Sequence, residues 1–303
     1  MTTDLSTDCR RRCTGETHQA LQVLRQAGKD GCAIPVARHP DQAALEAAVF
    51  LGACKMGGLS PHPLGILKVR PEPERLTIRL LDEPYVVRYW AERLLPIQAA
   101  VAGEDDDPRD CVFGVAGLRS RVGAGGVTLY RPGTGAQVLL TGFNTRWWQR
   151  VSALLATSGP VLFTGSTWTP VERAAHHAYQ ATDRGEASVV SAILRRIRAT
   201  AGPGEINSTD VWSTGQEGLR LETTDGPPCP ELLRLLCEGP WGLGWQAEHT
   251  WCTCGSAAPQ GCRIDFRLPG GRRVDYSNLH WGRTNDERRQ TTVAELNSLA
   301  FAG

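Results

Sequence analysis

Apolar and polar residues recur with two different periods along this chain, and the changes of period divide it into helices and strands. Apolar residues spaced three and four positions apart indicate helices, whereas strict alternation indicates strands with one buried face. A pair of short helices is predicted within residues 9–28, with Thr14 or Thr17 as N-cap, and another helix over residues 41–54. Further helices are predicted near residues 171–182, 186–199, 231–237 and 291–300.

The helix over 186–199 has its apolar residues on one face, which is typical of a helix that packs on a core. Those residues are Val189, Val190, Ile193, Leu194 and Ile197. We therefore expect the arginines of the same segment, Arg195, Arg196 and Arg198, to lie off the apolar face.

Three segments predict β-hairpins, because alternating residues flank proline- and glycine-containing turns. The sequences are "LKVRPEPERLTIRL", "VTLYRPGTGAQVLL" and "RIDFRLPGGRRVDY", with turns near residues 71–74, 132–135 and 269–271. Each hairpin leads into a helix or loop. The pattern predicts an α+β fold of repeated hairpin–helix units, with antiparallel sheets, helices on one face and a helical N-terminal segment.

The same reasoning divides the chain into four parts. An N-terminal helix pair covers residues 1–30, and hairpin–helix units cover residues 31–103, 111–200 and 206–303. The acidic stretch "EDDDPRD" at 104–110 and the "AGPGE" stretch at 201–205 are the predicted connections between units.

A tryptophan beside arginines follows each hairpin. The residues are Arg88 and Trp90 after the first, Arg146, Trp147, Trp148 and Arg150 after the second, and Trp281 and Arg283 after the third. Such a pair can seal a junction between helix and sheet. It can also form a surface on which nucleic-acid bases stack while arginine binds phosphates. Adjacent side chains diverge, so we expect at most one of Trp147 and Trp148 to be buried and the other to be exposed.

Composition narrows the function classes. The chain has 303 residues, 41% of them hydrophobic and 21% charged, and a formal net charge of +1, so any binding to nucleic acid depends on local basic patches. Only Lys29, Lys55 and Lys68 are lysines among 33 basic residues, which is typical of GC-rich genomes such as those of actinobacteria. We expect no secretion signal and no membrane span, and hence a cytoplasmic protein with reduced cysteines.

One cysteine-rich stretch predicts a metal site. In "EHTWCTCGSAAPQGCRIDF", His249, Cys252, Cys254 and Cys262 could bind Zn²⁺ tetrahedrally, with Cys237 as the substitute ligand. Cys229 also lies upstream. The spacing departs from paired C-x2-C knuckles, so reduced, partly buried thiols are the alternative. Four protein ligands would make such a zinc structural, because no coordination position stays open.

Other candidate chemistry is thinner. Glu172 and His176 are four positions apart on one predicted helix, next to His177, and Asp265 and Asp275 lie on the two arms of the third hairpin. No nucleophile-elbow, zinc-protease, phosphate-loop or dinucleotide motif is present. We therefore expect a non-catalytic binding protein for nucleic acid or a protein partner. The alternative is a metal-dependent hydrolase or nuclease that uses the third hairpin or the histidine helix.

Overall fold

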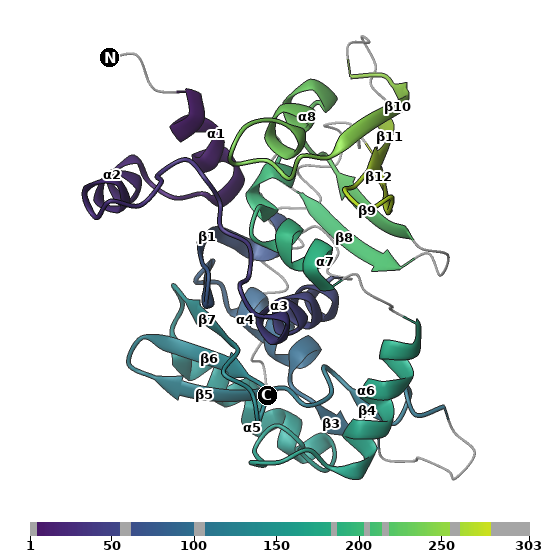
Figure 1. Cartoon of the computed structure of the whole chain (residues 1–303). Helices are drawn as coiled ribbons and strands as arrows, with labels where there is room; N and C mark the ends of the chain where they lie inside the picture. The colour runs from purple at the N-terminus through teal and green to yellow at the C-terminus, as the bar shows by residue number, and fades with distance from the viewer. Residues whose placement is uncertain are drawn as a thin grey trace, which may run out of the picture.

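Two five-stranded sheets with two helices between them make up the protein (Figure 1). The computed structural model describes residues 5–54, 62–99, 107–182, 187–202, 207–213, 218–254 and 261–279. Helices α3 (Pro40–Ala53) and α7 (Ala187–Leu194) lie side by side at the centre of the molecule. The α+β class predicted from the hydrophobic pattern is confirmed.

Sheet 1 belongs to the first half of the chain, which we call unit 1 (residues 40–158). Its strands lie in the order β1-β2-β7-β6-β5. After α3, the elements of unit 1 are β1 (Ile66–Glu72), β2 (Arg75–Leu80), α4 (Pro84–Leu94), β5 (Arg119–Gly123), β6 (Gly126–Tyr130), β7 (Gln137–Thr141) and α5 (Thr145–Ser158). A two-stranded ribbon, β3 (Ile97–Gln98) with β4 (Val112–Phe113), interrupts the unit between α4 and β5.

Sheet 2 belongs to unit 2 (residues 187–279), with strands in the order β8-β9-β12-β11-β10. After α7 and the 3₁₀ turn η2 (Ile197–Thr200), its elements are β8 (Ser208–Ser213), β9 (Gly218–Thr224), α8 (Cys229–Cys237), β10 (Gln246–Cys252), β11 (Gly261–Arg267) and β12 (Arg273–Leu279). Helix α6 (Pro170–Thr182) lies between the two units in the sequence.

The two units share one topology. In each, a hairpin is followed by a helix and a three-stranded meander, whose last strand runs parallel to the second strand of the hairpin. A glycine opens the middle strand of both meanders, Gly126 in β6 and Gly261 in β11. A Cβ there would lie 2.1 Å from the Leu140 oxygen or 2.6 Å from the Asn278 oxygen. Unit 2 is therefore a structural duplicate of unit 1, and the repeat is larger than the predicted hairpin–helix pair.

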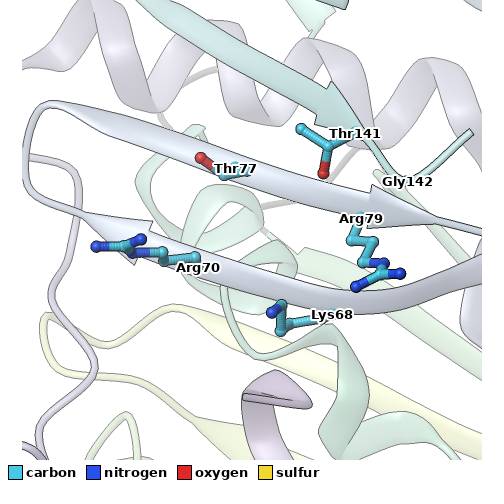
Figure 2. A pocket seen from close by; sticks show the side chains of 6 residues that line it. All are labelled: Lys68, Arg70, Thr77, Arg79, Thr141 and Gly142. Atoms are coloured by element: carbon cyan, nitrogen blue, oxygen red, sulfur yellow. The ribbon is translucent and has the colours of Figure 1, made fainter. Parts of the chain in front are cut away.

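Each sheet has one buried face and one solvent-facing side. In β2, Leu76, Ile78 and Leu80 are fully buried, whereas Thr77 and Arg79 between them point to the other side (Figure 2). Alternation of this kind follows from the two-residue period of a strand. The sheets are mixed rather than antiparallel throughout, because β2 pairs with β7 and β9 with β12 in parallel.

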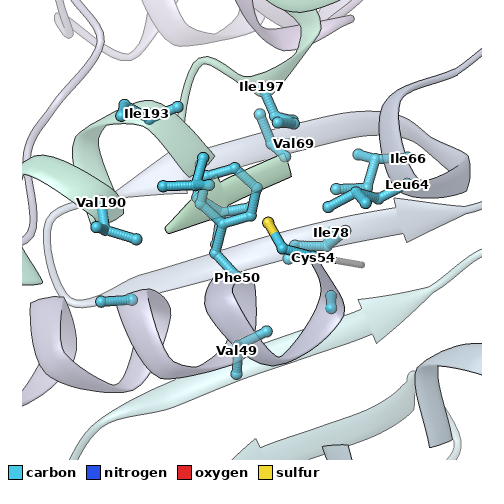
Figure 3. Packing of buried hydrophobic residues seen from close by; sticks show 14 of the residues in the cluster. Val49, Phe50, Cys54, Leu64, Ile66, Val69, Ile78, Val190, Ile193 and Ile197 are labelled. Atoms are coloured by element: carbon cyan, nitrogen blue, oxygen red, sulfur yellow. The ribbon is translucent and has the colours of Figure 1, made fainter. Parts of the chain in front are cut away.

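The central core lies where α3 and α7 pack on sheet 1. Phe50 of α3 is fully buried near Val190 and Ile193 of α7 and Val69 of β1 (Figure 3). Both helices are apolar on nearly all sides, as expected for helices enclosed by other elements rather than exposed along one face.

A buried ion pair joins the two units through these helices. Glu46 of α3 and Arg195, which directly follows α7, are both fully buried, with Nη2 to Oε1 at 2.6 Å and Nε to Oε2 at 2.8 Å. Side chains and carbonyl groups around the pair satisfy its other hydrogen-bonding positions: Gln42, Ser191, Pro35 and Glu72. A pair without those extra bonds would not offset its desolvation cost.

The burial of these arginines corrects the expectation that they lie off the core. Arg195 is fully buried and Arg196 is 2% exposed. Arg196 donates to the carbonyls of Trp241, Ile34 and Gly242, and so ties the N-terminal segment to unit 2. The polar side of this segment faces the other unit and the N-terminal segment instead of solvent, which is why its arginines are buried.

The local predictions agree well with the structure. The two N-terminal helices are α1 (Leu5–Thr14) and α2 (His18–Gln26), and the Thr17 side chain caps α2. All three predicted hairpins are confirmed: β1–β2, β6–β7 and β11–β12, with their turns outside helices. The helix predicted near 291–300 lies outside the described residues.

Replacing Glu46 by glutamine should strongly destabilise the fold. The substitution keeps the shape of the side chain but leaves the Arg195 charge buried without a counter-ion, at a cost of about 3–5 kcal/mol. Urea denaturation measures the free energy of unfolding. The control is Arg38→Gln, which removes an exposed pair with Glu74 at 3.0 Å and should cost less than about 1 kcal/mol. Equal effects of the two substitutions would contradict the role given to the buried pair.

Candidate functional site

Four cysteines of unit 2 converge at one end of sheet 2. The sulfur atoms of Cys229, Cys252, Cys254 and Cys262 all lie within 4.8 Å of one another. The Sγ of Cys262 is 3.0 Å from that of Cys254 and 3.5 Å from that of Cys252. Ligands held at 2.3 Å from a common ion lie about 3.8 Å apart in a tetrahedron, so this spacing could hold a metal ion.

The fold brings the four thiols together from three places. Cys252 ends β10 and is directly opposite Cys262 of β11, and Cys254 lies in the loop between these strands. Cys229 is the first residue of α8. Two backbone N–H groups donate to sulfur: that of Cys229 to the Sγ of Cys254, and that of Cys254 to the Sγ of Cys252, both at 3.4 Å. Such bonds, together with the N-terminus of α8, favour thiolates.

The described residues of unit 1 contain no equivalent cluster. With Gly126 aligned to Gly261, the position of Cys262 is taken by Val127, which is fully buried. The connection from β5 to β6 has only residues 124–125, whereas residues 253–260 connect β10 to β11. The cysteine loop is therefore a feature that unit 2 has and its duplicate lacks.

Three of the four predicted ligands belong to this cluster: Cys252, Cys254 and Cys262. The fourth position is filled by Cys229, whereas Cys237, the predicted substitute, is not part of the group. The side chain of His249 lies outside the described residues. A signal for Cys229 was present in "DGPPCPELL", where prolines mark the start of a helix next to a cysteine.

Burial raises the pKa of two of these thiols, Cys229 and Cys262. It raises the pKa of Cys262 to about 11, with the nearby Cys254 thiol adding to the shift. Metal binding must therefore displace protons from the cluster, and metal affinity should fall as the pH falls.

Most of the predicted tryptophan–arginine positions do not form an open platform. Trp90 is fully buried and donates to the Leu64 carbonyl at 2.9 Å, and Trp148 is 1% exposed with its Nε1 donating to Ser120. Both are core residues, because α4 and α5 pack their tryptophan faces inward. Trp147 is half-buried against the core, so at most one tryptophan of the pair is buried, as predicted, but its neighbour is not fully exposed.

The arginines of the same segments differ in their surroundings. Arg146 and Arg150 are exposed on α5. Arg88 is half-buried and forms an ion pair with Glu92 at 2.6 Å. Trp281 and Arg283 lie outside the described residues.

A basic surface that the sequence reasoning missed lies on the solvent-facing side of sheet 1. A shallow groove of about 310 Å³ crosses β1, β2 and the end of β7 (Figure 2). We call it the basic groove; its lining residues are Lys68, Arg70, Thr77, Arg79, Thr141 and Gly142. Lys68 lies directly opposite Arg79 in the β1–β2 register. Two like charges at such a position repel each other and do not stabilise the sheet.

The duplicate unit shows that this fold does not require the basic residues. In the shared register, Lys68 corresponds to Ser208 and Arg79 to Thr224. The pair of Arg70 with Thr77 corresponds to Asp210 with Glu222. The same positions are thus basic in unit 1 and neutral or acidic in unit 2.

The carboxylates considered for catalysis are engaged by arginines. Asp275 of β12 lies 3.0 Å from Arg220 of β9 and 3.1 Å from Arg263 of β11, and so forms ion pairs with both neighbouring strands. Glu172 is fully buried and receives two hydrogen bonds from Arg119, at 2.7 and 3.0 Å. Glu172, four positions before His176 on α6, is therefore part of a buried ion pair with Arg119.

Comparison with known protein families, characterised proteins and solved structures found no match to this chain. Among the described residues, no helix has both the length and the apolar composition needed to cross a membrane.

Replacing a cysteine of the cluster should remove bound metal and lower the melting temperature. The purified protein should contain about one metal ion per chain by mass spectrometry, and Cys254→Ser should lose it, because three thiols bind a soft ion more weakly than four. Cys237→Ser is the matched control, since Cys237 lies in the same unit but outside the cluster. A wild-type protein that contains no metal, together with a Cys254→Ser variant that melts at the wild-type temperature, would contradict the site.

Proposed function

We propose that this protein is a non-catalytic binding protein that binds nucleic acid in the basic groove of sheet 1. The observation that carries the proposal is the opposed pair of Lys68 and Arg79. Neither side chain forms an ion pair with a described residue, and the two face the same shallow groove. A phosphate between them would relieve their mutual repulsion and release counter-ions from the nucleic acid.

Other groups on the same side of the sheet fit a phosphodiester backbone. The Thr77 hydroxyl group can donate a hydrogen bond within the groove, whereas the Thr141 hydroxyl group donates to the Ile78 carbonyl at 3.4 Å and can still accept one. Along one row of the register, Arg70 of β1 is followed by Thr77, Leu139, Thr128 and finally Arg121 of β5. Five strands spaced by about 4.8 Å place the two arginines about 19 Å apart. A nucleic-acid strand could therefore contact more than one basic group across the sheet.

The tryptophan segments have a smaller part in this proposal. Trp90 and Trp148 are buried, so neither ring is available for stacking. Trp147, with Arg146 and Arg150, forms a separate surface on α5 that the proposal does not require. An acidic protein partner would also fit basic residues, but the threonine hydroxyls and forked guanidinium groups favour phosphate.

The proposal assigns Zn²⁺ to the four-cysteine cluster as a structural ion. Four thiolates suit zinc and would fill its tetrahedral shell, leaving no position for a substrate. The ion would fasten the start of α8 to the loop between β10 and β11. A reducing, intracellular compartment is part of this proposal, since the ten cysteines, all in the described part of the chain, form no disulfide.

The hydrolase alternative has less support. Its candidate carboxylates, Asp275 and Glu172, accept hydrogen bonds from arginines.

Replacing the opposed pair with the residues of the duplicate unit should weaken binding and its salt dependence. The variant Lys68→Ser/Arg79→Thr keeps residue types that unit 2 accommodates at the same positions. Each lost phosphate contact lowers the log–log salt slope by about 0.7 for a single strand, so the double variant should lower it by about 1.4. Fluorescence anisotropy with labelled single-stranded DNA and RNA, over a series of salt concentrations, measures both quantities.

Two controls separate the groove from other surfaces. Trp147→Ala should change the affinity for the oligonucleotide little. A loss of about 1–3 kcal/mol of binding free energy would show instead that bases stack on α5. Polyglutamate should not displace the oligonucleotide efficiently. Binding of polyglutamate without binding of nucleic acid would replace the proposal with an acidic protein partner.

A further inference from the structure

Among the residues that the structure describes, the buried arginines are satisfied by protein groups, with one exception. Arg10 donates to Glu16, Arg119 to Glu172, Arg195 to Glu46, and Arg196 to main-chain carbonyls. The exception is Arg131, which follows β6 and is 9% exposed. Its Nε atom is buried without a hydrogen-bond partner, and its guanidinium group forms no ion pair within the described part of the chain.

A buried cation without a hydrogen-bonded anion is expensive, because burial removes hydration that no ion pair replaces. The carboxylate whose charge acts on Arg131 is that of Asp41, at the start of α3, but the two groups form no ion pair. Burial consequently lowers the pKa of Arg131 to about 10. The site lacks an anion in hydrogen-bonding contact with the guanidinium group.

The surroundings of Arg131 are rigid and carry a second polar group. Its guanidinium carbon lies 5.8 Å from the centre of the Trp168 ring. That ring is fixed by a hydrogen bond from Nε1 to the Pro132 carbonyl, at 3.4 Å, and by Gly117, where a Cβ would lie 2.1 Å from the ring. The His176 ring of α6 lies 5.0 Å from Trp168, centre to centre. Arg131 and His176 therefore flank one fixed aromatic ring.

We propose that Arg131, Trp168 and His176 form a binding site for a small oxyanion of the phosphate type. The guanidinium group supplies the charge and a forked set of donors, and the imidazole supplies one further N–H. Burial, followed by the charge of Arg131 and by His177, lowers the pKa of His176 to about 4, so the ring is neutral near pH 7 and can donate without adding charge. The inference is independent of the basic groove, which involves none of these residues.

Inorganic phosphate is the probe that tests this site. We expect the His176 ring signals in the NMR spectrum of the full-length wild-type protein to shift on titration with phosphate, at constant ionic strength set by chloride. The melting temperature should rise with the logarithm of the phosphate concentration once the site is saturated. In the variant Arg131→Met, both responses should be lost, and without phosphate the variant should melt no lower than the wild type, because an unpaired buried charge has been removed.

Two comparisons separate this site from other arginines. Arg121→Met removes an arginine that also lies over an aromatic ring, 5.9 Å from Tyr130, but is exposed, and it should keep the full phosphate response. Lys68→Ser/Arg79→Thr should keep the His176 shifts as well. Unmoved His176 signals at saturating phosphate, or an equal phosphate response in Arg131→Met, would overturn the proposal. If the Arg131→Met variant does not fold, the His176 shifts in the wild-type titration still test the proposal.

Discussion

The contact between α3 and α7, with the Glu46–Arg195 ion pair inside it, is the constraint on which the rest of the molecule depends. The two helices pack on each other and on the buried face of sheet 1. The pair is buried at a point where four further groups complete its hydrogen bonds. Hydrophobic packing alone is compatible with several positions of one helix along the other. The Glu46–Arg195 ion pair forms at only one of these positions. The relative placement of the two sheets follows from that register.

Duplication followed by divergence explains the distribution of chemistry. Both units keep the sheet order, the parallel central pair and the glycine that opens the middle strand of the meander. Unit 2 carries the four-cysteine cluster, and two of its members, Cys254 and Cys262, stand where unit 1 has a two-residue connection and Val127. Unit 1 carries Lys68 and Arg79 where unit 2 has Ser208 and Thr224. Because the shared fold accommodates both Lys68 with Arg79 and Ser208 with Thr224, the basic pair is not needed to form the sheet.

Local features of the fold could be predicted from the sequence, since their causes are local. The hairpin turns depend on proline and glycine within a few residues, and the Thr17 cap depends on its own helix. Strands β8 and β9 were missed because polar residues occupy part of their buried side. Thr223 is fully buried there, in hydrogen-bonding contact with Tyr276 at 2.8 Å and Asn278 at 3.0 Å. This network replaces the apolar alternation on which the prediction of strands relies.

The candidate sites were less predictable, because they depend on which elements meet. Cys229 joins the cysteine cluster only through the placement of α8 beside β10, and Trp90 and Trp148 are buried only because α4 and α5 pack on sheet 1. The basic groove arises from the pairing of β1 with β2, which sets Lys68 opposite Arg79. The sequence alone does not show that Lys68 and Arg79 are opposite each other, because that depends on the register of the hairpin.

Mapping a bound oligonucleotide by amide NMR tests the account most directly. We predict that chemical-shift changes on addition of single-stranded nucleic acid are confined to β1, β2, β7 and the adjoining strands of sheet 1, with the largest changes around Lys68, Arg79 and Thr141. The equivalent positions in sheet 2, around Ser208, Asp210 and Glu222, should not change. Shifts centred on sheet 2 or on α5, or none at protein concentrations that saturate the anisotropy signal, would contradict the assignment of the binding surface.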